Sequence, residues 1–214
     1  MFLTHGAGRR LGTLQTALRE IFRYFPSSQA VVVPRDDLFI AQIHLQAFIL
    51  NVSGVFDNWA WAFVHRHGLL AAIGDRRRVG MFISYTEEHL PAPLRDYLRQ
   101  AHIRTWYSQY HKDYRDALAH RIPVHIPPAY FTEEEAQRHE ELEAQKAQLI
   151  QAQDWQQLNV VWAEQDALGV PCPLFVHEYQ IQGGAPYLHP QLLSDAKTVV
   201  EFGNLFYEAW QADQ

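Results

Sequence analysis

The chain has 214 residues, of which 48% are hydrophobic and 20% are charged, and its formal net charge is −6. This composition excludes a disordered chain, and the negative charge excludes a global positive field that would draw the protein onto nucleic acid. The length suits one well-filled core, so we expect a single helical domain over residues 1–214.

Cysteine usage and hydropathy favour the cytoplasm. Cys172 is the only cysteine, which excludes an internal disulfide and a thiolate zinc cage. No basic region precedes a long apolar run at the N-terminus, and no uninterrupted apolar stretch approaches the ~20 residues that cross a bilayer as a helix. We therefore expect a cytoplasmic protein that does not span a membrane.

Hydrophobic spacing predicts two amphipathic helices in the first third of the chain. In residues 11–25, large apolar residues recur every three or four positions. From Asp36 the same spacing continues without proline as far as His67, which predicts one long second helix. Residues 68–92 are expected to form a connector, with a short strand at 81–85.

Prolines set the limits of a third helix. Pro93 suits the first turn of a helix, and Pro123 disfavours helical geometry at the residue before it, so we expect a helix from Pro93 to Arg121. Its last turn carries His120. Aromatic residues alternate with basic ones along this helix, and we expect most of them to lie in the core rather than to stack on nucleic-acid bases.

Residues 132–168 are expected to form a helical hairpin that projects as an arm. Thr132 and Glu135 form a capping box, and three successive glutamates suit the positive end of the helix dipole. The helix that follows is polar almost all round through Gln153, which is typical of a solvated outer helix. The next segment regains an apolar face and ends at Gly169.

The last part of the chain predicts a small β-ribbon and a final helix. Residues 174–187 carry a few β-forming residues before a Gly183–Gly184 turn, which is too little for a sheet. A last helix opens at Pro190. The expected fold class is therefore all-α, an up-and-down helical bundle with long connectors and at most a small β-ribbon.

The segment from Arg115 to His120, RDALAH, is the clearest candidate for chemistry. Arginine's planar fork suits the charge that builds up on a phosphate, and a histidine of pKa about 6.5 can take a proton from a ribose 2′-hydroxyl. Five residues of an ideal helix turn through about 500°, which leaves the two side chains roughly 140° apart. Either the last turn distorts, or a second chain completes the site across a two-fold axis.

This segment resembles the signature of the HEPN superfamily, small all-α domains that usually dimerise and in which an arginine and a histidine share one helix. Four residues separate Arg115 from His120, and Asp116 matches the polar residue that often follows the arginine. Active members cleave RNA without a metal. The resemblance therefore implies that His120 is a general acid or base and Arg115 a phosphate clamp, with Asp116 and Tyr114 in support.

A wider resemblance covers most of the chain. The segments that carry it are DNWAW at 57–61, ALAHRIPVHIPP at 117–128, and His189 to Gln191 with Asp195 and Thr198. They are similar to a group of uncharacterised bacterial HEPN-like helical proteins. The resemblance implies a shared architecture and a shared site, and it implies no substrate.

The second helix carries polar residues at heptad spacing, namely His44, Asn51, Asn58 and His65. Aromatic neighbours of Asp57 and Asn58 predict partial burial, and buried polar groups need hydrogen-bond partners. We expect Asp57 or Asn58 to hydrogen-bond the arginine or the histidine of the motif. The second helix would then orient the site as well as fill the core.

Twelve histidines suggest a metal site, but the spacing does not support one. Neither a Glu-x-x-His pair nor a His-Glu-x-x-His motif is present, and Gly6–Ala7–Gly8 lacks the lysine of a phosphate-binding loop. We expect no metal and no cofactor.

The leading hypothesis is a metal-independent endoribonuclease, toxin-like or defence-related, that acts on RNA as a homodimer with Arg115 and His120 at its cleft. Trp106 and Tyr110 are expected at the two-fold interface, and an antitoxin is the expected protein partner. The alternative is a non-catalytic HEPN-like helical dimer that binds a nucleotide or a protein partner. The acidic balance of the chain favours this alternative.

Overall fold

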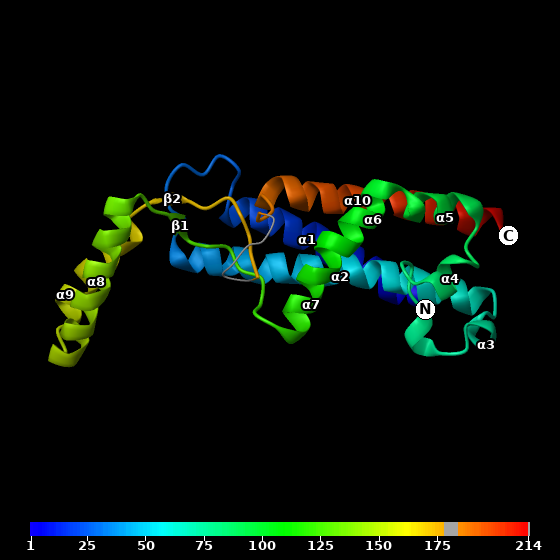
Figure 1. Cartoon of the computed structure of the whole chain (residues 1–214), viewed down its shortest axis with the longest axis horizontal. Coiled ribbons are helices and arrows are strands. Elements are labelled where there is room, and N and C mark those ends of the chain that lie inside the picture. Colours follow the sequence, from blue (N-terminus) through cyan, green and yellow to red (C-terminus); the bar gives the residue numbers. More distant parts are fainter. Residues whose placement is uncertain (178–183, 214) are drawn as a thin grey trace.

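The fold is that of a computed structural model, which describes residues 1–177 and 184–213 and is predominantly helical (Figure 1). In this described part the regular strands are β1 (Ala129–Tyr130) and β2 (Val170–Pro171), which pair antiparallel over two residues each. The predicted all-α helical bundle is therefore confirmed.

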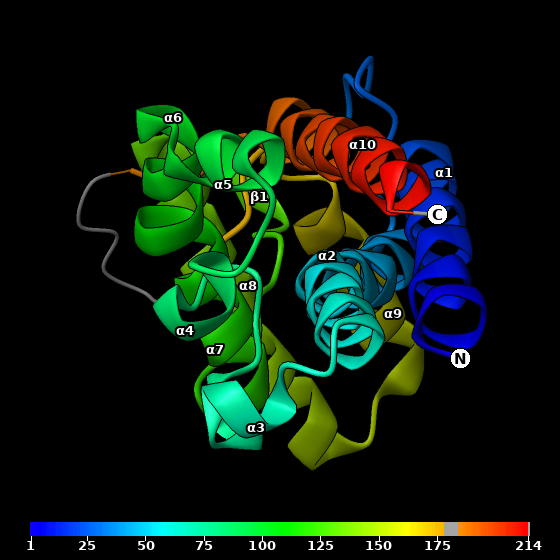
Figure 2. The ribbon, with the colours of Figure 1, turned by 90° about the vertical axis from the view of Figure 1, so that its right-hand side faces the viewer.

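The bundle is built around α2 (Arg35–Arg66), which contributes buried residues from Leu38 to Val64. α1 (Gly8–Tyr24) and α10 (Leu188–Ala212) lie along it on one side, and α7 (Lys112–His120) packs on the other (Figure 2). By length and hydropathy α2 could cross a membrane, but the core helix of a soluble protein passes the same test. Here Leu45, Phe48 and Val52 are fully buried, as core side chains are.

A guanidinium group between α1 and α2 fixes the position of the two helices relative to each other. Arg10 donates from Nε to Oδ1 of Asn58 and from Nη1 to Oδ1 of Asn51, each at 3.0 Å. It lies against Gly54, where a side chain would take its space. Asn58 therefore binds Arg10, and the expectation that it binds the Arg115 motif is wrong.

The third helix is interrupted rather than continuous as expected. α5 (Ala92–Arg99) ends where Gln100 adopts an extended ψ of 136°, and α6 (Ala101–Thr105) then leads into a π-helical turn, Trp106–His111, and α7. Neither proline nor glycine marks this break in the sequence. The buried Glu87 provides its physical cause, because it pairs with Arg99 at 2.7 Å on one side of the break and with Arg104 on the other.

The expected strand at 81–85 is also wrong. The chain turns there and forms a short helix, α4 (Ser84–Glu87). Thr86 Oγ1 donates to the carbonyl of Arg78 at 3.0 Å and accepts from the amide of Gly80 at 3.1 Å. These local bonds give the backbone an alternative to strand pairing. The remaining short elements are a π-helical turn at Phe2–Ala7, α3 (Leu70–Ile73) and a 3₁₀ turn at Arg76–Arg78.

The arm, residues 132–168, is an antiparallel pair of helices, α8 (Glu133–Ala152) and α9 (Trp155–Asp166), that projects from one end of the bundle (Figure 1). Both bonds of the capping box between Thr132 and Glu135 are present. β1 and β2 connect the arm to the bundle, and Arg35 pairs with Asp166 across the junction at 3.2 Å. Of the expected ribbon at 174–187, Leu174 pairs with Tyr187, and residues 178–183 lie outside the described residues.

Replacing Gly54 with alanine is expected to destabilise the protein by roughly 1–3 kcal/mol, because the added Cβ must displace the Arg10 guanidinium from between the helices. The matched control is Gly12→Ala in α1, where a Cβ meets nothing within 4 Å. That change should stabilise by up to about 1 kcal/mol through helix propensity alone. Urea unfolding of both variants checks the prediction, and equal effects would contradict it.

Candidate functional site

A polar cavity of about 180 Å³ lies between α2, the segment before α4, the π-helical turn Trp106–His111 and α7. From here on, the π-helical turn means Trp106–His111. Its polar lining residues are Ser53, Asp57, Tyr107, His111 and Arg115, and its apolar ones include Phe56, Met81, Phe82 and Ile83. The cavity thus brings together two residues singled out by the sequence, Asp57 and Arg115. Because small-molecule pockets usually measure about 300–1,000 Å³, it has room for one small polar group rather than for a whole nucleotide.

Arg115 supplies the positive charge of the cavity. Its Nε lies 3.0 Å from Oδ1 of Asp116, but the two are too poorly aligned to form a hydrogen bond, and this buried Nε has no other partner. The charge of Arg115 helps to lower the pKa of His111 and opposes the rise in the pKa of Tyr107 that burial causes. Arg115 therefore retains donor capacity for an anion inside the cavity.

His111 is a second group with an unused ring nitrogen. The ring is buried, stacks on Trp106 at 4.8 Å, and has its Nε2 2.7 Å from Oγ of Ser53. Burial, together with the charge of Arg115, lowers its pKa to about 3, so the imidazole is neutral at neutral pH. When Ser53 donates to Nε2, Nδ1 carries the hydrogen, and no acceptor meets it. A buried donor left unpaired costs about 1–3 kcal/mol, which an acceptor on a ligand would recover.

Asp57 faces the same cavity but does not bind the motif. The residue is exposed, so the partial burial expected for it is wrong. Desolvation by the surrounding protein still raises the carboxyl pKa, and the charges of Arg115 and Arg10 partly offset that rise. In the described part of the chain, no hydrogen bond or ion pair joins Asp57 to Arg115 or His120. The expected bond is therefore absent, although both side chains line the cavity. Opposite charges across this space suit a ligand that both accepts and donates hydrogen bonds.

The buried carboxylate of Asp195 on α10 positions the π-helical turn. Its oxygens accept from Nε1 of Trp106 at 2.7 Å, from the hydroxyl of Tyr110 at 2.8 Å and from Nε2 of Gln191 at 2.8 Å. Single π-helical turns are common at functional sites, and this one carries His111 into the cavity wall. Trp106 and Tyr110 are half-buried, and their polar atoms bond within the chain. Their place at a dimer interface stays a prediction.

The other predicted residues lie outside the cavity lining. Tyr114 is buried and donates to the carbonyl of Phe175 at 3.5 Å, so it packs in the core. His120 is the last residue of α7 and is exposed. α7 stays α-helical as far as His120, which puts it about 7.5 Å along the axis and roughly 140° around from Arg115. One chain therefore does not bring the two motif residues side by side.

The sequence analysis missed three polar residues of the cavity, Ser53, Tyr107 and His111. A signal for them was present, because Ser53 precedes Asp57 by four residues, and Tyr107, His111 and Arg115 follow one another at steps of four. Residues four apart share a helix face.

No three His, Cys, Asp or Glu side chains among the described residues lie close enough together to hold a metal ion. No protein-family model, curated protein or solved structure matches this chain. The functional inference therefore depends on the chemistry of the cavity.

Replacing Asp195 with asparagine tests how this network titrates. Burial raises the pKa of Asp195 from 3.8 to about 6, although the hydrogen bonds from its three donors lower it. Such a group contributes stability that is full below pH 3.8 and is lost as the pH rises through about 6. Relative to D195N, the wild type should lose at most about 3 kcal/mol of unfolding free energy between about pH 4 and pH 7. Urea unfolding across this range measures the difference, and a constant difference would refute it.

Proposed function

We propose that this chain is a metal-independent endoribonuclease of the HEPN type that acts as a homodimer, with Arg115 binding the scissile phosphate of RNA. One observation carries the proposal. A charged guanidinium and a buried imidazole, each with a buried nitrogen that makes no hydrogen bond, line the same small polar cavity.

A phosphate group matches this cavity in charge, hydrogen bonding and size. Guanidinium–phosphate bonds are charge-assisted and about twice as strong as neutral ones. When Ser53 donates its hydroxyl hydrogen to Nε2 of His111, the Nδ1 of His111 adds a second donor. The nucleoside part of the substrate would remain outside a space of about 180 Å³. Binding through one phosphate also suits a chain of net charge −6, which lacks a broad basic surface.

Cleavage needs a general base and a general acid, and His120 is the proposed group. The ribose 2′-oxygen attacks the adjacent phosphorus, and the bond to the 5′-oxygen breaks. His120 of the second chain takes the proton of the 2′-hydroxyl and gives a proton to the departing 5′-oxygen. The products are a 2′,3′-cyclic phosphate and a 5′-hydroxyl end. Because α7 stays helical to its end, a second chain rather than a distorted turn would complete the dyad.

Asp57 has a positioning role in this proposal. A carboxylate across the cavity from Arg115 can accept a hydrogen bond from a ribose hydroxyl next to the bound phosphate. Holding both groups fixes the angle of attack, and misplacement by about 1 Å can cost roughly 100-fold in rate. Asp57 therefore orients the nucleotide relative to Arg115.

We place this activity in the cytoplasm, with a toxin-like or defence-related role and RNA as the substrate. Cys172 is free and buried, which suits a compartment that keeps thiols reduced. An antitoxin would be the corresponding protein partner.

Incubation of the purified protein with mixed RNA in EDTA tests the proposal. The wild type is expected to produce 2′,3′-cyclic phosphate ends, and Arg115→Ala and His120→Ala should each reduce the rate at least about 100-fold. Asp57→Ala should also remove the activity. His102→Ala is the matched control, because this histidine is exposed on α6 and lies outside the cavity. Absence of cleavage by the wild type, or full activity of R115A, would overturn the proposal.

The second candidate is a non-catalytic helical dimer that binds a nucleotide. It is favoured by the placement of His120 outside the cavity and by His111, whose pKa of about 3 makes it a weak base at neutral pH. Calorimetric titration with a 3′-mononucleotide separates the two candidates. Binding that R115A abolishes, in a protein that leaves RNA intact, would favour the binder over the enzyme.

A further inference from the structure

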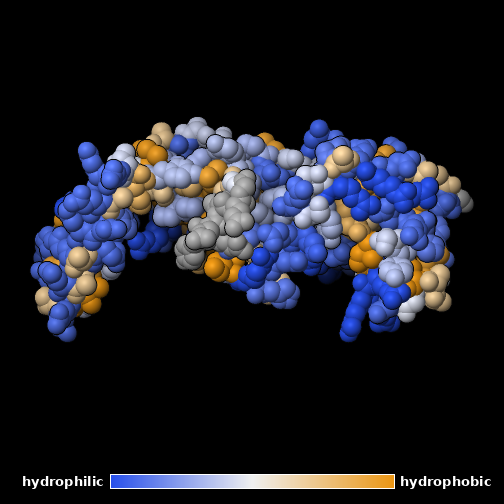
Figure 3. All heavy atoms as spheres, viewed as in Figure 1, coloured by the Kyte–Doolittle hydropathy of each residue, from blue (hydrophilic) through white to orange (hydrophobic). Residues whose placement is uncertain are grey.

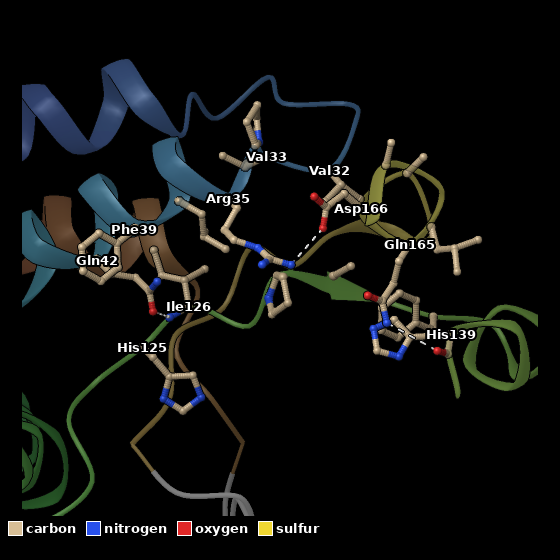
Figure 4. Close-up of a pocket in the computed structure, with 18 residues that line it drawn as sticks. Val32, Val33, Arg35, Phe39, Gln42, His125, Ile126, His139, Gln165 and Asp166 are labelled. Carbon is tan, nitrogen blue, oxygen red and sulfur yellow. Dashed lines mark hydrogen bonds and ion pairs between the residues drawn. The ribbon is translucent and has the colours of Figure 1, made fainter. Parts of the chain in front are cut away.

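A second cavity, of about 650 Å³, lies where the arm joins the bundle (Figure 4). Phe39, Gln42 and Ile126 face it from the bundle, while Gln165 and Asp166 face it from the arm. Its volume falls within the range of about 300–1,000 Å³ that is usual for ligand pockets, which often form at such junctions. The cavity therefore has room for one or more large side chains of a partner.

Exposed apolar side chains lie on the cavity wall and along the arm. Phe39 lies on its wall and is 63% exposed, with the buried Leu38 and Ile126 beside it. On the arm, Trp155 and Trp162 are 58% and 37% exposed. They are seven residues apart on α9 and so share a face. Figure 3 shows hydrophobic residues at the junction and on the arm among hydrophilic ones. Large apolar side chains left in water mark interaction surfaces.

Charge identifies the kind of partner. Residues 132–168 hold nine Asp and Glu against two Lys and Arg, a net charge of −7, whereas the rest of the chain carries +1. Both basic residues of the arm already form ion pairs, Arg138 with Glu141 and Glu164, and Lys146 with Glu143. The cation of the cavity wall, Arg35, is likewise paired with Asp166. The arm therefore presents a negative surface whose tryptophan rings can also receive cations.

We propose that the junction cavity and the arm bind a basic protein segment, which inserts an apolar side chain beside Phe39 and sets lysines or arginines against the arm. RNA is disfavoured because seven net negative charges repel a phosphate backbone. A second copy of the chain is disfavoured because arm would meet arm with like charge. A basic partner with an apolar anchor satisfies both the cavity and the charge. This inference is independent of RNA cleavage.

Fluorescence anisotropy with labelled synthetic peptides and the full chain tests the proposal. The probes are a helical peptide of lysines and leucines, the same peptide with glutamates for lysines, and the same peptide with serines for leucines. The lysine–leucine peptide should bind in a salt-sensitive manner, at least about 10-fold more tightly than either of the others. Equal binding of the glutamate or the serine peptide would overturn the proposal.

Matched variants locate the binding surface. Phe39→Ala should weaken binding of the lysine–leucine peptide about 10-fold. The control, Tyr207→Ala, removes a ring of the same 63% exposure on α10 and should leave binding within about 2-fold of the wild type. The double variant Glu134→Lys with Glu140→Lys on the arm should also weaken peptide binding about 10-fold. Glu88→Lys with Glu208→Lys, the same charge change at exposed sites on the bundle, should have little effect.

Three results would contradict this assignment. Equal effects of the arm and bundle variants would show that the peptide binds by general charge alone. A wild-type dimer that F39A dissociates in light scattering would place a second copy in the cavity. Labelled RNA that binds the wild type but does not bind F39A would show that nucleic acid occupies the junction cavity.

Discussion

The buried carboxylate of Asp195 is the constraint on which the Arg115 cavity depends. A carboxylate inside a core needs donors, and Trp106, Tyr110 and Gln191 supply three. Two of those donors belong to the π-helical turn, so the chain leaves regular α-helical geometry there and turns His111 into the cavity wall. Fixing the turn fixes α7 after it, and with α7 the guanidinium of Arg115. The hydrogen bonds of Asp195 in the core thus position His111 and Arg115 at the cavity.

The chain separates its charges between two places. The bundle carries a net charge of +1 and holds an arginine in a cavity suited to a phosphate, while the arm carries −7 and borders a cavity suited to a basic partner. An overall charge of −6 conceals this division. The acidic arm disfavours non-specific contact with nucleic acid, so recognition of RNA would depend on a few directed bonds at Arg115 rather than on a broad basic surface.

Hydrophobic spacing and capping signals predicted the helical class, the long α2 and the capping box at Thr132, because these are local features. The interruption of the third helix was not predictable, since it follows from Glu87 binding arginines on both sides of Gln100, which depends on the tertiary fold. Two of the five polar residues of the candidate site were identified, Asp57 and Arg115. Asn58 was assigned to the wrong partner because no local pattern shows that Arg10 lies beside it.

Mixing two inactive variants tests the central claim, that Arg115 of one chain and His120 of another cleave RNA together. R115A and H120A would be co-refolded or co-expressed, and the mixed dimer assayed in EDTA. A dyad shared across the two-fold axis predicts that activity returns, because one site of the mixed dimer holds an intact Arg115 and an intact His120 from different chains. If the mixed dimer forms and stays as inactive as its parents while the wild type cleaves, the shared site is contradicted.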